Sequence, residues 1–203
     1  NFKKMSGFIL ASQSPRRKQL LAWADIDFDV IISAAEEDFP ADMDVQDVPV
    51  HIAQKKAIAV QQKIKDEFPI HQGKWIIAAD TIVVLENEII GKPIDRADAI
   101  SILQKLSGKT HQVITGVYIV NDLESRYFSE TTLVHFHPLT LSQIEYYVDQ
   151  YQPYDKAGAY GIQDWIGVIG IRGIEGDFYN VMGLPVSKLL GYLPTKTTKF
   201  TTK

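Results

Sequence analysis

Short apolar runs alternate with amphipathic segments along the first half of the chain. Runs of strand length, in which apolar residues follow one another with few interruptions, cover residues 8–11, 28–32 and 75–85. Between them, apolar residues return every three or four positions in residues 15–24 and 48–68, which is the period of one helix face. The pattern therefore predicts three buried strands separated by helices, as in an α/β fold.

The second half of the chain continues the alternation with longer strands. Asp95 stands directly before a helix-periodic segment, as an N-cap does, and Ser107 and Gly108 follow the end of that segment. Two runs on either side of Asn121 and Asp122 are typical of strands in a meander. We predict a turn, a short strand, a helix, two long strands and a helix over residues 86–88, 89–90, 96–106, 111–120, 125–137 and 141–149.

The C-terminal part is predicted to add one strand, one helix and a tail. Residues 166–171 form an apolar run of strand length, and a helix is expected over residues 178–190. Residues 195–203 are polar and rich in Lys and Thr, so we expect them to fray. We find no repeat and no clear linker, and we predict a single domain over residues 1–203 with its core at about 7–192. The expected class is α/β, a mixed twisted sheet with flanking helices and a cleft between two lobes.

Composition narrows the possible partners and compartment. The chain is 45% hydrophobic and 23% charged, as ordinary globular proteins are. No apolar run approaches the ~20 residues that span a bilayer, so we expect no membrane partner. The net charge of −4 argues against nucleic-acid binding, and an anionic small ligand would need locally placed cations. The absence of cysteine excludes disulfides and thiol chemistry and favours a cytoplasmic protein.

The stretch "LASQSPRR" is the first candidate site. It places a polar loop with Ser12 between a strand and a helix that Ser14 is expected to cap. Free backbone N–H groups and the helix dipole make such a turn an anion site. Arg16 and Arg17 stand at the positive end of that dipole, which disfavours cations unless an anion is bound there. The alternative is an ordinary cap with two solvated arginines, since the glycines of the common phosphate-binding loops are missing.

An acidic residue interrupts the most apolar predicted strand. Asp80 lies inside the run "IIAADTIVVL", where a carboxylate is costly to bury unless it is paired, liganded or facing a cleft. We therefore interpret Asp80 as a metal ligand or a general base. The alternative is a polar residue at a sheet edge or bulge. Thr81 is expected on the opposite face of a regular strand and reaches the same ligand only if the strand bends.

Five further positions are weaker candidates. Glu36 and Glu37 could join the buried carboxylate around a hard cation, although the residues alone favour a solvated acidic loop. Lys56 lies on a helix face of small residues, and Lys92 follows a predicted hairpin in "IGKP". Either lysine could point into a cleft or simply into solvent. Gln163 carries an amide that could pair with the edge of a nucleobase, or it could belong to a structural turn.

Taken together, these stretches resemble the Maf family. The motifs that carry the resemblance are "LASQSPRR", "AADTIV", "GKP", "LSGKTHQVITGV", "DKAGAYGIQ" and "GDFYNVMGLP", in this order and over residues 8–190. Maf-like proteins are nucleoside triphosphate pyrophosphatases, related in fold to the inosine triphosphate pyrophosphatases, and were first named as inhibitors of septum formation. The resemblance also suggests a homodimer.

The resemblance implies a reaction and a role for each candidate. A nucleoside triphosphate and water would give the monophosphate and pyrophosphate, with Asp80 as the proton acceptor that activates water. Glu36 and Asp80 would hold a divalent metal cation, Mg²⁺ or Mn²⁺. The residues implied in phosphate binding are Ser12, Arg16, Arg17, Lys56 and Lys92.

Substrate choice follows from the same resemblance. A branch similar to 7-methyl-GTP hydrolases carries tryptophan at the position of Arg16, so arginine there, with Thr81 and Gln163, resembles the branch that acts on dTTP and UTP. Modified pyrimidine nucleotides would present a similar base edge, and the bulky Trp165 could alter the pocket. The alternative function is a nucleotide-binding regulator of cell division in which catalysis is incidental.

Overall fold

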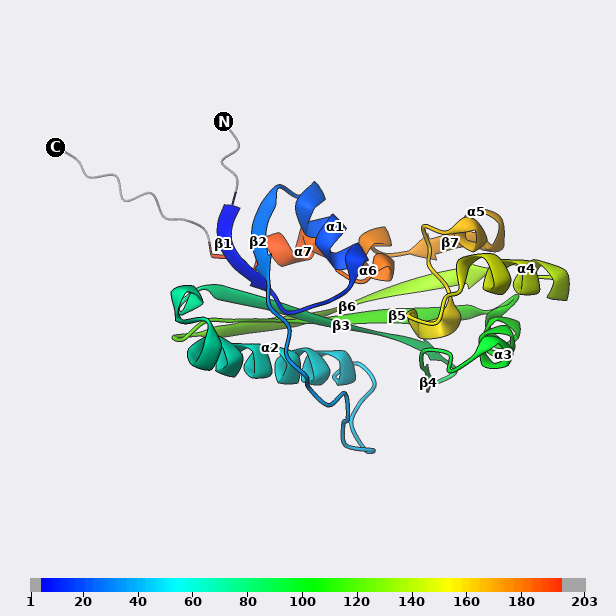
Figure 1. The fold of residues 1–203 in the computed structure, drawn as a ribbon. Coiled ribbons are helices and arrows are strands. Elements are labelled where there is room, and N and C mark those ends of the chain that lie inside the picture. Colours follow the sequence, from blue (N-terminus) through cyan, green and yellow to red (C-terminus); the bar gives the residue numbers. More distant parts are fainter. Residues whose placement is uncertain (1–4, 195–203) are drawn as a thin grey trace.

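The protein forms one mixed, twisted sheet with helices on both of its faces (Figure 1). The computed structural model describes residues 5–194, so the predicted tail lies outside it. The strands are β1 (Met5–Leu10), β2 (Ile26–Val30), β3 (Trp75–Leu85), β4 (Glu88–Ile90), β5 (Thr110–Val120), β6 (Ser125–Phe136) and β7 (Ile171–Glu175). The helices are α1 (Pro15–Trp23), α2 (Val48–Glu67), α3 (Arg96–Leu106), α4 (Leu141–Tyr151), α5 (Trp165–Gly170), α6 (Phe178–Met182) and α7 (Val186–Leu190), with short 3-10 turns η1 (Pro69–His71) and η2 (Ala157–Ala159).

The strand order leaves a gap at one edge of β3. The sheet runs β2-β1-β3-β5-β6-β7, with β1 parallel to β2 and β3 and the later neighbours antiparallel. β1 pairs with residues 75–77 of β3, and β4 pairs with residues 83–85 along the same edge. In the described part of the chain, residues 78–82 therefore have no strand partner on this side. The gap lies where the chain leaves β1 and turns into α1.

Helices cover the two faces of the sheet unequally. α2 alone lies along one face, and the other helices lie above the opposite face or at the end that carries β4 and β7 (Figure 1). On the α2 side, Ala53 and Ala57 pack against Ala78 of β3. Gly116 of β5 lets α2 approach closely, because a Cβ there would lie 2.2 Å from the backbone N of Val50. On the opposite face, the larger cluster joins α1, α3 and α4 to the sheet.

The predicted fold class and most predicted elements are confirmed. The mixed sheet, the flanking helices and the alternation through residue 151 agree with the sequence pattern within a few residues at each boundary. Ser14 caps α1 by accepting a hydrogen bond from the backbone N of Arg17, and Asp95 caps α3 by accepting one from Asp98. Within the described residues, no helix is long and apolar enough to cross a membrane.

The strand predicted at residues 166–171 is wrong. These residues form α5, and β7 begins only at Ile171. A short apolar run does not distinguish a strand from a buried helical turn by periodicity alone. Ile166 and Gly170 are one helical turn apart, and both are buried. Gly170 faces Leu139, whose side chain lies 3.1 Å from the point where a Cβ of the glycine would stand.

The single helix predicted over residues 178–190 is also wrong. The segment contains two short helices, α6 and α7, separated by Gly183, Leu184 and Pro185. Gly183 adopts a φ of 115°, which favours glycine and ends α6, and proline cannot donate the hydrogen bond needed to continue a helix. The break leaves the carbonyl of Gly183 free to accept hydrogen bonds from outside the helix.

Candidate active site

The gap at the edge of β3 opens both faces of the sheet to one hollow. Asp80 lies on the α2 face, and its Oδ1 is 2.6 Å from Nζ of Lys56. Thr81 lies on the opposite face, and its Oγ1 is 3.0 Å from Nη2 of Arg17. Both side chains line the same hollow, although they point to different faces. An unpaired strand edge therefore brings together groups that a continuous sheet would separate.

Arg17 is a partly buried cation held by neutral oxygens. Its Nε donates to the Gly183 carbonyl at 2.8 Å, and its Nη1 lies 3.2 Å from Oγ of Ser12. Thr81 supplies the third oxygen, as described above. Burial lowers the pKa of Arg17, while the negative charge of Asp80 acts in the opposite direction. Because no carboxylate forms an ion pair with Arg17 in the described part of the chain, its charge is available to an anion.

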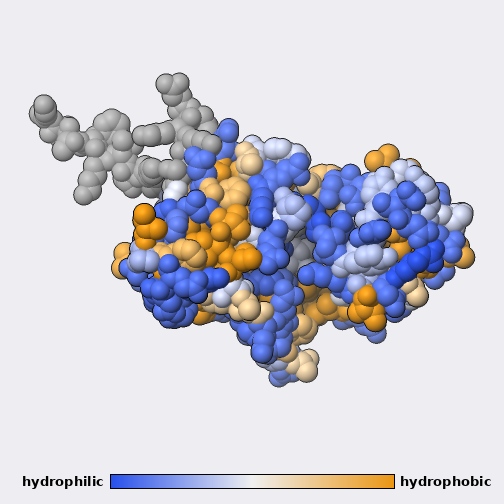
Figure 2. Space-filling model, in the orientation of Figure 1, coloured by the Kyte–Doolittle hydropathy of each residue, from blue (hydrophilic) through white to orange (hydrophobic). Residues whose placement is uncertain are grey.

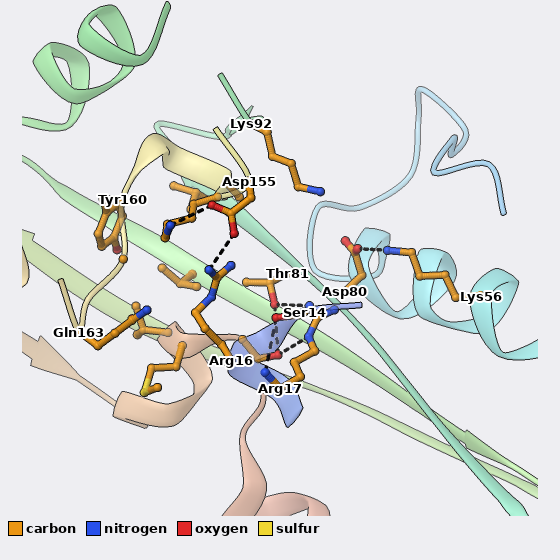
Figure 3. A pocket seen from close by; sticks show the side chains of 18 residues that line it. Ser14, Arg16, Arg17, Lys56, Asp80, Thr81, Lys92, Asp155, Tyr160 and Gln163 are labelled. Carbon is orange, nitrogen blue, oxygen red and sulfur yellow. Dashed lines mark hydrogen bonds and ion pairs between the residues drawn. The ribbon is translucent and has the colours of Figure 1, made fainter. Parts of the chain in front are cut away.

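Arg16 links the two sides of the cleft. Its Nη1 is 3.0 Å from Oδ2 of Asp155, and Nζ of Lys156 is 2.9 Å from Oδ1 of the same carboxylate (Figure 3). Burial alone would raise the pKa of Asp155, but its hydrogen bonds to Lys156 and Arg16 lower the pKa overall. Figure 2 shows that the surface is hollowed between the two parts of the molecule that this ion pair connects. The expected cleft between two lobes is therefore present.

Lys56 holds two carboxylates at once. Its Nζ is 2.7 Å from Oε1 of Glu37 and 2.6 Å from Oδ1 of Asp80. Burial would raise the pKa of Glu37, but the hydrogen bond and the positive charge of Lys56 lower it overall. Glu36 is exposed and is not among the residues that line either hollow. Among the described residues, no group of three or more His, Cys, Asp or Glu side chains is placed to bind a metal.

Two hollows meet at the arginines. One contains Ser12, Ser14 and Glu37 and lies beside the start of α1. The other extends away from α1 and has Gln163 on one side of an apolar floor (Figure 3). That floor is made by Val83, Val113, Val181 and Met182. The residues shared by both hollows are Ser14, Arg16, Arg17, Lys56, Lys92 and Asp155. The arrangement suits a ligand with an anionic part beside α1 and a flat organic part near Gln163.

Tyr147 of α4 holds the loop that carries Gln163 in place through two hydrogen bonds. The hydroxyl of Tyr147 accepts from the backbone N of Gly161 at 3.1 Å and donates to Oδ2 of Asp164 at 2.7 Å. Burial, with the carboxylate of Asp164, raises the pKa of Tyr147 well above its usual range, so it stays a neutral donor. Trp165 packs against Tyr146 and does not line either hollow.

The Maf-like protein family model matches residues 7–195. The chain belongs to the Maf family. A protein named dTTP/UTP pyrophosphatase from Porphyromonas gingivalis is 47% identical over 194 residues, which cover 95% of each chain. Proteins of the same name from Cytophaga hutchinsonii and Bacteroides thetaiotaomicron are 48% and 45% identical, covering 91% of this chain and 82% and 93% of theirs.

A solved structure gives a more distant match to this Maf protein. The Staphylococcus aureus Ham1 protein has a TM-score of 0.44 and 17% sequence identity, over 64% of this chain and 71% of that chain. The homodimer and the cytoplasmic location expected from the sequence stay predictions.

The structure brings most of the predicted site residues of this Maf protein together. Only Glu36 lies apart, and its neighbour Glu37 takes the place beside Lys56. The predicted residues that line the two hollows are Ser12, Arg16, Arg17, Lys56, Asp80, Thr81, Lys92 and Gln163. Sequence reasoning missed Asp155, Lys156 and the carbonyl of Gly183. The motif "DKAGAYGIQ" contains the first two, but the sequence gives no signal that Asp155 would face Arg16.

Tyr160 forms part of the wall of the site, and a buried histidine stands behind it. His111 Nε2 is 2.7 Å from the hydroxyl of Tyr160, and the ring lies edge-on to Tyr160 and Phe136. Burial, with a smaller contribution from the charge of His135, lowers the pKa of His111 to about 4. The folded protein therefore keeps this histidine neutral at pH values where the unfolded chain binds a proton.

The stability of this Maf protein should consequently fall in mild acid. Because the pKa of His111 is depressed on folding, its contribution is complete above about pH 6.5 and is lost as the pH falls toward 4. We expect the free energy of unfolding to drop by about 2 kcal/mol between pH 7.5 and pH 5 from this group. Urea unfolding at a series of pH values measures the drop. His111→Gln and His111→Phe should both flatten the profile, and an unchanged slope in both variants would contradict this assignment.

Proposed function

We propose that this Maf protein hydrolyses dTTP and UTP, and modified pyrimidine nucleotides of similar shape, to the monophosphate and pyrophosphate. The observation that carries the proposal is the convergence of Asp80 and Arg17 in one hollow that also reaches Gln163, with Arg17 partly buried and in no ion pair with the described residues. The names of the relatives at 45–48% identity support the same reaction and the same substrates.

The triphosphate would lie beside the start of α1. Arg17 and Lys92 face the hollow, and no ion pair neutralises them within the described residues. The guanidinium of Arg17 and the backbone N–H of Arg16, which makes no hydrogen bond among the described residues, can both donate to phosphate oxygens. Arg16 can join them when it exchanges the carboxylate of Asp155 for a phosphate group. Binding would therefore use cations already present in the cleft and needs no positive net charge.

Asp80 would act as the proton acceptor. The residue is 9% exposed, and its Oδ1 lies 2.6 Å from the ammonium of Lys56. A water molecule would lose its proton to Asp80 and attack the α-phosphorus. The bond from that phosphorus to the oxygen bridging to the β-phosphate would break, and pyrophosphate would leave with the electron pair. Positioning and neutralisation of charge account for most of the catalysis in such transfers.

The carboxylates present fit a divalent cation brought with the substrate. Glu37 and Asp80 converge on one ammonium group, so their oxygens already share one location where positive charge is favourable. Mg²⁺ typically takes one or two carboxylates, substrate phosphate oxygens and waters, which agrees with a site of fewer than three acidic ligands. We propose Glu37 and Asp80 as its protein ligands, in place of Glu36 and Asp80. The cation, Mg²⁺ or Mn²⁺, would neutralise charge on the departing pyrophosphate.

Two adjacent glutamates give a matched test of the metal site. We expect Glu37→Gln to raise the Mg²⁺ concentration for half-maximal UTP hydrolysis by about tenfold, because the remaining carboxylate binds the cation less tightly. Glu36→Gln, which changes the same charge one residue away, should leave it unchanged. Titration of the initial rate with MgCl₂ measures both variants. The reverse result, with only Glu36→Gln shifted, would restore Glu36 as the ligand.

Gln163 would read the base. The imide edge of thymine or uracil presents acceptor, donor and acceptor groups, which an amide matches in part. We expect Gln163→Ala to lower kcat/KM for UTP by about tenfold and to change the low value for CTP little. The exposed Gln62→Ala on α2 is the control. A variant that keeps the full ratio of UTP to CTP activity would show that another group reads the base.

A nucleotide panel tests the proposed substrates directly. The rates of pyrophosphate release from dTTP, UTP, CTP, GTP and 7-methyl-GTP are compared with MgCl₂ present. We expect the highest kcat/KM with dTTP and UTP. Preference for 7-methyl-GTP would keep the reaction but overturn the roles of Arg16 and Gln163 in specificity. Binding without turnover of any nucleotide would favour the regulatory alternative.

A further inference from the structure

A chain of buried polar groups lies behind Thr81 and outside both hollows. Thr115 of β5 pairs in register with Thr81 of β3, and their Oγ1 atoms are 2.9 Å apart. The Oγ1 of Thr115 is also 3.2 Å from the backbone carbonyl of Asn180 in α6. Thr115 and Asn180 are completely buried, so solvent cannot replace these contacts. Polar groups at such depth are costly unless each is satisfied.

The groups at the two ends of this row of hydrogen bonds, Arg17 and the Asn180 carbonyl, fix the direction of each bond. The carbonyl of Asn180 can only accept, so Thr115 donates its single hydroxyl hydrogen there. Thr115 must then accept from Thr81, which uses the hydrogen of Thr81. The lone pairs of Thr81 consequently face Nη2 of Arg17, which can only donate. The order of donation is Arg17 to Thr81 to Thr115 to Asn180.

The same group of residues positions a second acceptor of Arg17, the Gly183 carbonyl. The Nδ2 of Asn180 donates to the carbonyl of Val113 and to Oγ1 of Thr132, both at 3.0 Å. These bonds hold α6 against β5 and β6. Gly183, which follows the last residue of α6, accepts at its carbonyl from Nε of Arg17 at 2.8 Å. Two sides of the guanidinium are therefore set by groups that meet at Thr115 and Asn180 (Figure 3 shows Arg17 and Thr81).

We propose that Thr115 is a positioning residue for phosphate binding, because it orients Thr81 and through it the guanidinium of Arg17. The inference rests on the proposed function, in which Arg17 binds the triphosphate. With valine at 115, the hydroxyl of Thr81 loses this acceptor and turns either to the Gly183 carbonyl, 3.5 Å away, which already accepts from Arg17, or into the hollow that Thr81 lines. In either case Thr81 is no longer held in one orientation, and the fork of Arg17 loses its fixed direction.

The test compares Thr115→Val with Thr115→Ser and with a neighbouring control. Thr131→Val removes the hydroxyl of a threonine on β6 that bonds to Gln46 and takes no part in the hydrogen bonds from Arg17 to Asn180. We expect Thr115→Val to raise KM for UTP and the Kd for inorganic tripolyphosphate about tenfold, with kcat within about twofold of the unmodified protein. Thr115→Ser should restore both constants, and Thr131→Val should leave them unchanged. Urea unfolding reports stability, and Thr115→Ala is used if the valine variant does not fold.

Two results would overturn the proposal. One is an unchanged KM and tripolyphosphate Kd in Thr115→Val or Thr115→Ala. The other is an equal rise of both constants in Thr131→Val, which would indicate a general loss of structure. Failure of the proposed function is distinguishable, because it would abolish UTP turnover in the unmodified protein. Tripolyphosphate binding that still weakens in Thr115→Val would support the positioning role even then.

Discussion

Replacement of Asp80 by asparagine is expected to lower kcat for UTP hydrolysis by about 10²- to 10⁴-fold, the usual contribution of a general base. The amide keeps the size of the side chain and can still face Lys56, but it cannot take a proton from water. At saturating MgCl₂, UTP affinity should stay within a few fold, because excess cation compensates for the lost carboxylate ligand and because Arg17 and Lys92, which have no ion-pair partner among the described residues, are untouched. Steady-state kinetics at saturating UTP give kcat. Calorimetry gives the Kd for UTP with the nearly inactive variant.

A matched substitution controls for loss of one negative charge. Asp66→Asn alters an exposed carboxylate on α2 that contacts only its neighbour Gln62 among the described hydrogen bonds. It should leave kcat and KM unchanged. Activity of Asp80→Asn within threefold of the unmodified protein would remove Asp80 from the role of proton acceptor. Loss of UTP binding together with activity would assign it to binding instead.

Arg17→Lys is expected to lower kcat/KM for UTP by about a hundredfold, mainly through KM. Lysine keeps the charge but lacks the planar fork that donates at once to Gly183, Thr81 and a phosphate. Hydrogen bonds to charged groups contribute about 1.5–3 kcal/mol each, so the loss of one aligned bond suffices for an effect of this order. Steady-state kinetics with UTP measure the change, and urea unfolding shows whether the variant keeps its fold.

An exposed arginine provides the control for this substitution. Arg96 makes a two-pronged ion pair with Asp149, with Nε 2.6 Å from Oδ1, away from both hollows. Arg96→Lys should change stability slightly and kinetics not at all. A kcat/KM for Arg17→Lys within threefold of the unmodified protein would show that charge alone, without the fork, binds the phosphates.

Local signals in the sequence predict most of the secondary structure and several of the residues that line the site. Ser14, Pro15 and the apolar run of β1 define a strand, a turn and a helix within a few residues, so α1 follows from short-range rules. Asp80 stands out because a carboxylate in an apolar strand has few explanations. The errors at residues 166–171 and 178–190 fall where short apolar segments fit both a strand and a helix.

Long-range contacts explain what the sequence does not predict. Two arginines in the first turn of α1 are unfavourable for the helix dipole alone. Arg16 meets Asp155, 139 residues away, and Arg17 meets the Gly183 carbonyl, 166 residues away. The latter contact also depends on the break between α6 and α7. Such pairings follow from the topology of the sheet, which no local pattern specifies.

The neighbours Glu36 and Glu37 show the limit of predicting single loop positions. The two residues are chemically identical neighbours, and the motif gives no reason to prefer either as a ligand. The choice depends on which carboxylate turns toward α2, where Glu37 reaches Nζ of Lys56. A one-residue difference in an irregular loop is therefore decided by backbone direction.

Identification of the products of UTP hydrolysis by ³¹P NMR tests the central claim most directly. The protein is incubated with UTP and MgCl₂ in water enriched in ¹⁸O, and the spectrum reports which phosphorus atom gains the label. Attack at the α-phosphorus predicts UMP that carries ¹⁸O, together with unlabelled pyrophosphate in equal amount. Formation of UDP and labelled inorganic phosphate would show attack at the γ-phosphorus and contradict the account.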